Sequence, residues 1–181
     1  MAQDRTNMVS LFDAGRWLGG KTSNILEMGD GFNELTEDWS PSFADTQYVN
    51  MKNGASSLNG YAFSMTPERE HLSDEFQNVI NEGFKKFPTG SDAESFYYRF
   101  YKTDTVEGAE NTFKAIKVPI VCGPASTGGS AGEALTSSIE IHGNGDVKEG
   151  TIAVAVSEGK VTFTWNDATT AQTGNESTAE S

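Results

Sequence analysis

The sequence predicts a mainly β protein, an antiparallel sandwich or barrel with one flanking α-helix at about residues 74–87. Short segments with alternating apolar residues follow one another in the second half of the chain, at 135–141, 151–156 and 161–165. Only one segment has the apolar spacing of an amphipathic helix. With 181 residues, the chain fits a single domain that can bury a sizeable core.

The predicted helix has clear start and stop signals. Ser73 or Asp74 can cap its first turn, and Lys85 and Lys86 suit the negative end of its dipole. Pro88 follows and prevents its continuation. Its apolar side chains recur at three- and four-residue intervals, so they are expected to form a core stripe against a sheet. The stripe consists of Phe76, Val79, Ile80, Phe84 and Phe87.

Two strands are predicted directly after the helix. Residues 95–101 are dense in aromatic side chains on both faces, which is typical of a strand covered on both sides. Residues 112–122 form the next strand, and Pro119 is expected to place it at a sheet edge or at a bulge. A Glu-Gly pair inside 157–160 predicts the tight turn of a final hairpin.

The chain divides into three parts. Residues 1–22 mix polar residues with isolated large apolar ones, which predicts an N-terminal arm or a short first strand. Residues 23–167 form the single β domain. Residues 168–181 contain no apolar side chain larger than Ala and are predicted to be disordered.

A long loop is expected at residues 40–60 because Pro, Asn, Gly and Ser interrupt this stretch repeatedly. Long loops in compact domains are usually functional or disordered, and the apolar content here argues against plain disorder. The loop is therefore expected to contact a partner surface through Phe43, Tyr48, Met51 and Leu58.

The chain is strongly acidic, with 26 acidic and 13 basic residues and a net charge of −13. This balance disfavours adhesion to nucleic acid, which depends on Lys and Arg. Six acidic residues and no Lys or Arg lie between Lys21 and Lys52. They form either a solvated face or a surface that repels a polyanion; the candidates for such a surface are Glu27, Asp30 and Glu34.

The sequence offers little that suggests catalysis, and neither a metal nor a cofactor is expected. Residues 128–132 match the G-x-S-x-G pattern, but a nucleophile elbow needs a following helix and a later acid and His in that order. The single cysteine, Cys122, excludes an intrachain disulfide and is expected to be buried. No apolar run is long enough for a membrane span, and the N-terminus lacks the apolar stretch of a signal peptide. Synthesis in the cytosol is therefore expected.

Three stretches resemble the major tail tube protein of long, non-contractile bacteriophage tails. They are residues 60–65 leading into the helix, residues 95–102, and residues 138–152 followed by 159–164. In the last stretch a strand, a Gly/Asp turn and a Gly-Thr pair precede the final hairpin. The resemblance covers roughly residues 20–165 and is one of layout more than of individual residues.

The resemblance implies a structural virion protein without enzymatic activity, made in the host cytoplasm and located in the tail. It implies hexameric rings that stack into a tube, with residues 40–60 as the inter-ring loop and a negatively charged lumen through which DNA passes without specific binding. It also implies tape measure, tail-tip and terminator proteins as partners. Two alternatives stay open: an inner tube protein of a contractile tail, bacteriocin or type VI secretion machine, and, more remotely, a virion decoration or adhesion domain.

Overall fold

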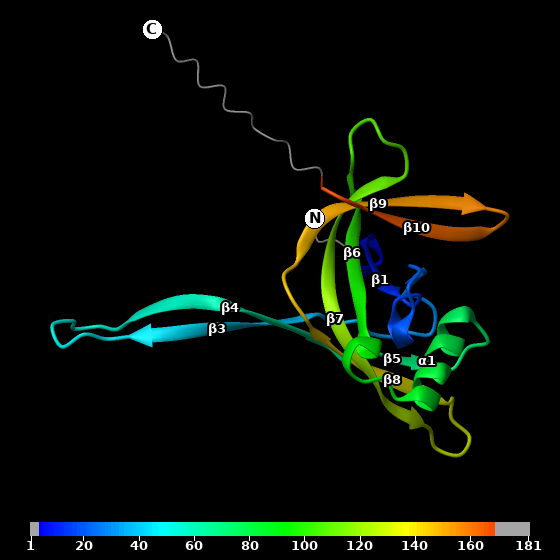
Figure 1. Ribbon diagram of the computed structural model, residues 1–181, viewed down its shortest axis with the longest axis horizontal. Coiled ribbons are helices and arrows are strands. Elements are labelled where there is room, and N and C mark those ends of the chain that lie inside the picture. The colour runs from blue at the N-terminus through cyan, green and yellow to red at the C-terminus, as the bar shows by residue number, and fades with distance from the viewer. Residues whose placement is uncertain (1–3, 169–181) are drawn as a thin grey trace, which may run out of the picture.

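The computed structural model describes residues 4–168 and contains one antiparallel sheet of ten strands with a single α-helix beside it (Figure 1). The predicted mainly β class with one flanking helix is confirmed, and the sheet does not close into a barrel. The strands are β1 (Met8–Asp13), β2 (Ile25–Glu27), β3 (Asp38–Thr46), β4 (Ala55–Met65), β5 (Glu68–Glu70), β6 (Glu94–Thr105), β7 (Thr112–Gly128), β8 (Thr136–Gly143), β9 (Lys148–Ser157) and β10 (Lys160–Asp167).

The strand order is β2-β1-β6-β7-β8-β4-β3, with β9 and β10 branching from β7 and with β5 paired to β8. The sheet therefore has two wings that share strand β7. One wing runs through β8 to the β3–β4 hairpin, and the other runs to the β9–β10 hairpin. The two hairpins project from opposite sides of the body (Figure 1). Of the predicted disordered tail, all but Ala168 lies outside the described residues.

The N-terminal segment is part of the body. Strand β1 lies between β2 and β6, and Val9, Leu11 and Phe12 are buried. The expectation of an arm over residues 1–22 is therefore wrong for residues 8–13, where the alternative of a short first strand holds. The apolar residues of this strand pack on both sides of the sheet, so the strand could not stay free without exposing them.

Strand β6 is covered on both faces, as its aromatic density predicts. Tyr97 belongs to a first core that lies toward helix α1, whereas Tyr98 and Phe100 belong to a second core that lies toward the β9–β10 hairpin. The first core is formed by residues from β1, β4, β6, β7, β8, the helix and Trp17. The second core is closed by partly buried residues of β9 and β10: Val154, Phe163 and Trp165.

Strand β7 is central, so Pro119 does not mark a sheet edge. On one side β7 pairs with β9 as far as Lys117 and with β8 from Ile120 onward. The carbonyl of Pro119 accepts a hydrogen bond of 2.8 Å from the Asn144 amide and so faces this same side. The nitrogen of a strand residue faces the same way as its carbonyl. The missing N–H of Pro119 thus lies in the gap between the two partner strands, where no ladder bond is lost.

Helix α1 spans Glu75–Lys86 and begins where the capping signals predict. The Asp74 side chain accepts a hydrogen bond of 2.8 Å from the Gln77 amide. Phe76 and Ile80 are buried, and Val79 and Phe84 are partly buried against the first core. Phe87 is 62% exposed, so its assignment to the core stripe is wrong. It adopts a left-handed backbone as the C-cap, and this change of direction takes its side chain off the buried face.

The expected loop at residues 40–60 is mostly a β-hairpin. Residues 38–46 and 55–65 pair as β3 and β4, and only residues 47–54 connect them. Asn50, Asn53 and Gly54 do lie in this connection, whereas Ser40, Ser42, Ser57 and Gly60 occupy strand positions on one face of the ribbon. The β9–β10 turn is as predicted, because Glu158 and Gly159 both have positive φ, which a two-residue type I′ turn requires.

Candidate assembly surfaces

The β3–β4 hairpin has one apolar face. Residues directly opposite each other in an antiparallel pair share a face, and three such pairs follow one another from the root of the hairpin outward. The pairs are Trp39 with Phe63, Pro41 with Tyr61, and Phe43 with Leu58. Phe63 is 5% exposed within the first core, whereas Phe43 is 61% and Leu58 47% exposed. The apolar face thus begins inside the core and continues into solvent.

The opposite face of the same hairpin is composed of small side chains. It carries no Lys or Arg, and its members include Ser40, Ser42, Ala44, Ser57 and Ala62. The hairpin is therefore amphipathic although no described part of the chain covers its outer apolar half. A surface of this kind on a soluble chain usually marks an interaction site.

The connecting residues 47–54 form an apolar tip. Tyr48, Val49 and Met51 are exposed, and Lys52 supplies the only positive charge in this turn. The Met51 amide donates a hydrogen bond of 2.9 Å to the carbonyl of Tyr48, which closes the turn. The four residues expected to contact a partner are thus all exposed on one projecting hairpin, but on two distinct parts of it: Phe43 and Leu58 on the flat face, Tyr48 and Met51 at the tip.

The root of the hairpin is fixed by Glu37, whose side chain is 6% exposed. Its carboxylate accepts hydrogen bonds from the Tyr97 hydroxyl at 2.6 Å, from Arg99 Nη1 at 2.7 Å and from Trp39 Nε1 at 2.9 Å. Burial, together with the adjacent Glu37 charge, raises the pKa of Tyr97 far above its usual range, so its hydroxyl stays protonated as a donor. The sequence placed Glu37 among six surface acids; only its three-dimensional partners reveal its structural role.

A second buried charge ties the helix to the sheet. Arg69 of β5 is 1% exposed and donates to Asp74 Oδ1 at 2.8 Å and to the Asp30 carbonyl at 2.9 Å. Its guanidinium carbon lies 5.3 Å from the ring centroids of both Phe32 and Phe76. The hydrogen bond from Arg69 lowers the pKa of Asp74. Sequence reasoning missed this residue, since a lone Arg in a short strand carries no signal of burial.

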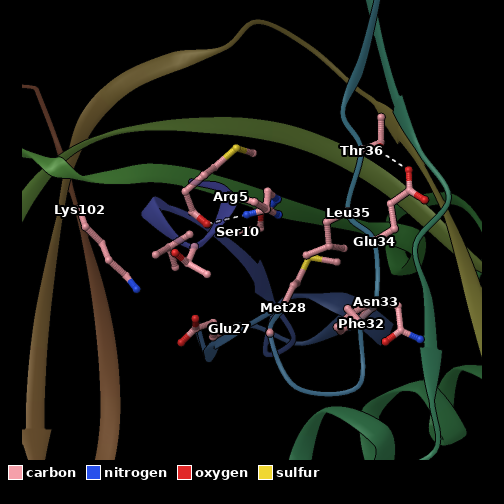
Figure 2. A pocket seen from close by; sticks show the side chains of 14 residues that line it. Arg5, Ser10, Glu27, Met28, Phe32, Asn33, Glu34, Leu35, Thr36 and Lys102 are labelled. Carbon is pink, nitrogen blue, oxygen red and sulfur yellow. Dashed lines mark hydrogen bonds between the residues drawn. The ribbon is translucent and has the colours of Figure 1, made fainter. Parts of the chain in front are cut away.

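A hollow of about 470 Å³ lies beside the root of the β3–β4 hairpin (Figure 2). Its inner wall is apolar and comes from β1 and from the segment that leads into β3: Met8, Val9, Met28, Phe32 and Leu35. Its rim is charged. Glu27 and Glu34, two of the three predicted lumen acids, lie there together with Arg5 and Lys102. The Glu34 carboxylate accepts a hydrogen bond of 2.8 Å from the Thr36 hydroxyl.

The predicted lumen acids are all exposed, but they do not form one uniform acidic face, because Arg5 and Lys102 lie among them at the hollow. A second group of exposed acids lies on the bare face of the β7-β8-β4-β3 wing. Asp38, Ser64, His142 and Val121 lie opposite one another across the strands and point away from the first core. Glu140 is the next residue on this face and accepts a hydrogen bond from His142 Nε2 or pairs with it at 2.8 Å.

The remaining candidate chemistry is dispersed. Ser130 lies in the connection between β7 and β8, and His142 is engaged with Glu140 on the sheet face. Cys122 is buried in the first core, and burial raises the pKa of its thiol well above the usual range. Among residues 4–168, no three His, Cys, Asp or Glu side chains come together as a metal site. No helix in that range is long and apolar enough to cross a membrane.

No protein-family model and no curated protein matches the sequence. Among solved structures, a chain of the sheath/tube terminator of the PVC extracellular contractile injection system has a similar fold, with a TM-score of 0.50 and 10% identity over 82% of this chain and 96% of that chain. A chain of the tube-terminating cap of the anti-feeding prophage matches with a TM-score of 0.46 and 11% identity, over 82% of this chain and 91% of that one. The fold of this protein is thus one that also occurs in contractile injection particles.

Proposed function

We propose that this protein is a structural subunit that assembles with copies of itself into a phage-tail-like tube. The observation that carries the proposal is the β3–β4 hairpin, whose apolar face starts in the first core and stays uncovered over Phe43 and Leu58. A second copy is the simplest partner for such a face, since every copy presents it. The outer strand of the β3–β4 wing, β3, also has an unpaired edge that a neighbouring chain can complete.

Between the two kinds of tube, the fold likeness favours the contractile systems. The solved structure with a TM-score of 0.50 belongs to the sheath/tube terminator of such a particle. The non-contractile phage tail, which the sequence layout resembles, is the second candidate. In either case we propose hexameric rings, a location in the tail or tail-like particle, and contacts with tape measure, tail-tip and terminator proteins.

The tube requires a surface along which its cargo moves, and we propose that this conduit surface is negatively charged. Glu27, Asp30 and Glu34 are one candidate set. The bare sheet face is the other, because the strand residues on it include Asp38 and Glu140 and no Lys or Arg. The absence of cations on that face would keep a polyanion such as DNA from adhering during passage. Its small side chains would also leave the wall smooth.

Negative-stain electron microscopy and light scattering of the purified protein test the proposal. The parent is expected to form rings or tubes as its concentration rises, with tail-tip partners added if nucleation is slow. Replacing Phe43 and Leu58 by Ser should abolish assembly while circular dichroism stays that of the parent. The matched control replaces Val156 and Val161, the exposed apolar pair at the tip of the other hairpin, by Ser as well. This variant should retain assembly.

Three outcomes have distinct meanings. A parent that stays monomeric at millimolar concentration, with and without its partners, contradicts the proposal. Rings that never stack indicate a terminating subunit in place of a tube subunit. A sheath gene beside this one in the genome would support a contractile system, and its absence would favour the non-contractile tail.

A further inference from the structure

The hollow beside the hairpin root and the tip of the hairpin have complementary properties. The hollow has apolar side chains inside, and its rim carries two acids, Glu27 and Glu34, and two bases, Arg5 and Lys102. The tip has exposed apolar side chains and one cation, Lys52. Within one chain the two are separated by the length of β3, so a tip cannot reach its own hollow. We propose that the hollow receives the hairpin tip of a second copy. This inference rests on the proposed function, since it names the receiving surface of the same assembly.

The size of the hollow suits such an occupant. At about 470 Å³ it lies within the range of about 300–1,000 Å³ that pockets use to enclose drug-sized ligands. Tyr48, Val49 and Met51 are the exposed apolar side chains that the tip offers to it. Met28 forms part of the wall that they would meet, and Met side chains adapt to irregular apolar partners.

The charges at the rim give the contact its orientation. Arg5 is already engaged, because its Nη1 donates to the Met8 carbonyl at 2.6 Å. Glu34 uses one carboxylate oxygen for the Thr36 hydroxyl and keeps the other available. In Figure 2, Glu34 and Thr36 lie on the side of the hollow from which the chain enters β3. Lys52 of the incoming tip would pair with Glu34, or with Glu27 across the opening, and its apolar neighbours would enter below it.

The position of the hollow also links it to the flat apolar face. Leu35 and Thr36 line the hollow, and β3 with its apolar pairs starts directly after them at Asp38. A hairpin whose tip enters this hollow can therefore lie along the uncovered Phe43–Leu58 face of the receiving copy. The two uncovered parts of the hairpin, its tip and its flat apolar face, are then buried in one contact. This contact accounts for the exposure of Tyr48 and Met51 as well as for that of Phe43 and Leu58.

Cross-linking between variants that each carry one added surface cysteine tests the inference. Cys122 is buried, so added surface cysteines are the reactive ones in the native protein. One variant carries Met51→Cys and the other, which bears a mass tag, carries Asn33→Cys, at an exposed position that lines the hollow. After mixing under assembling conditions and mild oxidation, we expect a disulfide-linked heterodimer on a non-reducing gel. The control partner carries Val156→Cys on the other hairpin and should give only background cross-linking.

A charge exchange provides a second readout. Lys52→Glu and Glu34→Lys should each raise the protein concentration needed for assembly by about fivefold, the upper range for an exposed ion pair. The double variant should restore the parent value, whereas Lys52→Glu combined with Glu107→Lys, an exposed acid between β6 and β7, should not. Assembly without the heterodimer or the rescue would overturn the inference and leave the proposed function intact. Failure of the parent to assemble would contradict both.

Discussion

The two hairpins have the same pattern of side chains but differ in how far the chain itself buries their apolar faces. In each, one face is apolar and the other is composed of small polar residues, and in each the apolar face starts in a core. Strand β10 of the β9–β10 hairpin contacts β2, and Phe163 and Trp165 are partly buried against the second core by the chain itself. The β3–β4 hairpin projects outward from the body (Figure 1), and the side chains of its apolar pairs become more exposed with distance from the core. Alternation alone therefore does not distinguish a strand pair that completes its own core from one that needs a partner.

The largest expected effect contrasts the root of β3–β4 with its outer half. Phe63→Ala should lower the free energy of unfolding by about 3–5 kcal/mol, because it opens a cavity between the Trp39 and Tyr97 rings. Phe43→Ala, on the same face further out, should change the stability of the monomer by less than about 0.5 kcal/mol. Urea denaturation, at a protein concentration too low for assembly, measures the free energy of unfolding of both variants. Equal costs for the two variants would mean that the outer half is covered within one chain.

The root of the β9–β10 hairpin should be nearly as sensitive. A Cβ added at Gly150 would lie 2.5 Å from the Asn166 carbonyl oxygen and 2.5 Å from the Trp165 ring. Gly150→Ala should therefore destabilise the protein by about 1–3 kcal/mol through overpacking. Tryptophan fluorescence during unfolding reports the change. Gly60→Ala in β4, where an added Cβ meets nothing within 4 Å, is the matched control and should be close to neutral.

Removing one charge at the β3–β4 root should have an effect comparable to that of Gly150→Ala. Glu37→Gln keeps the shape of the side chain but leaves Arg99 without a carboxylate, and we expect a loss of about 1–3 kcal/mol. Glu34→Gln, at an exposed position three residues earlier, serves as the control. Thermal melts compare the two. A neutral Glu37→Gln would show that the aromatic pair Trp39 and Phe63 fixes the hairpin without the polar network.

The smallest expected effect concerns the helix start, which is tied to β5 through Arg69 and belongs to neither hairpin. Hydrogen bonding to Arg69 lowers the pKa of Asp74 from 3.8, so this carboxylate stabilises the fold above that pH, and the contribution is lost as the pH falls through the lowered value. Asp74→Asn should therefore melt below the parent at neutral pH and converge with it in strong acid. Melts from pH 7 to pH 2 check this; a difference that persists unchanged at pH 2 would contradict the linkage.

The sequence predicted correctly those elements of the fold that depend on local residue patterns. The helix, its cap and the final hairpin turn follow from apolar spacing and from residues with special backbone preferences, and the aromatic density of 95–101 correctly indicated two covered faces. The hairpin at 38–65 was mistaken for a loop because Ser and Gly on one face of a ribbon resemble turn residues when the pairing partner is unknown. Phe87 was misplaced because a backbone reversal, which apolar spacing cannot reveal, ends the helix there.

The candidate site was predicted less completely than the fold. The four proposed contact residues are exposed, which agrees with their expected role and leaves the contact itself a prediction. The hollow could not be foreseen, since it joins β1 with a segment some twenty residues later and with Lys102 of β6. Glu37 and Arg69 owe their roles in part to partners 60 and 39 residues away, respectively, and a single sequence contains no trace of such pairings.

The position of β1 in the sheet has a consequence for how the protein is made on the ribosome. Val9 and Phe12 emerge about ninety residues before their partners in strand β6. Translation proceeds at about 5–20 residues per second, so the nascent chain waits several seconds before β1 can be inserted. During that interval its apolar side chains are available to chaperones or to other nascent chains. Completion of the body is thereby delayed until β6 has left the exit tunnel, long after the β3–β4 hairpin has become free to form.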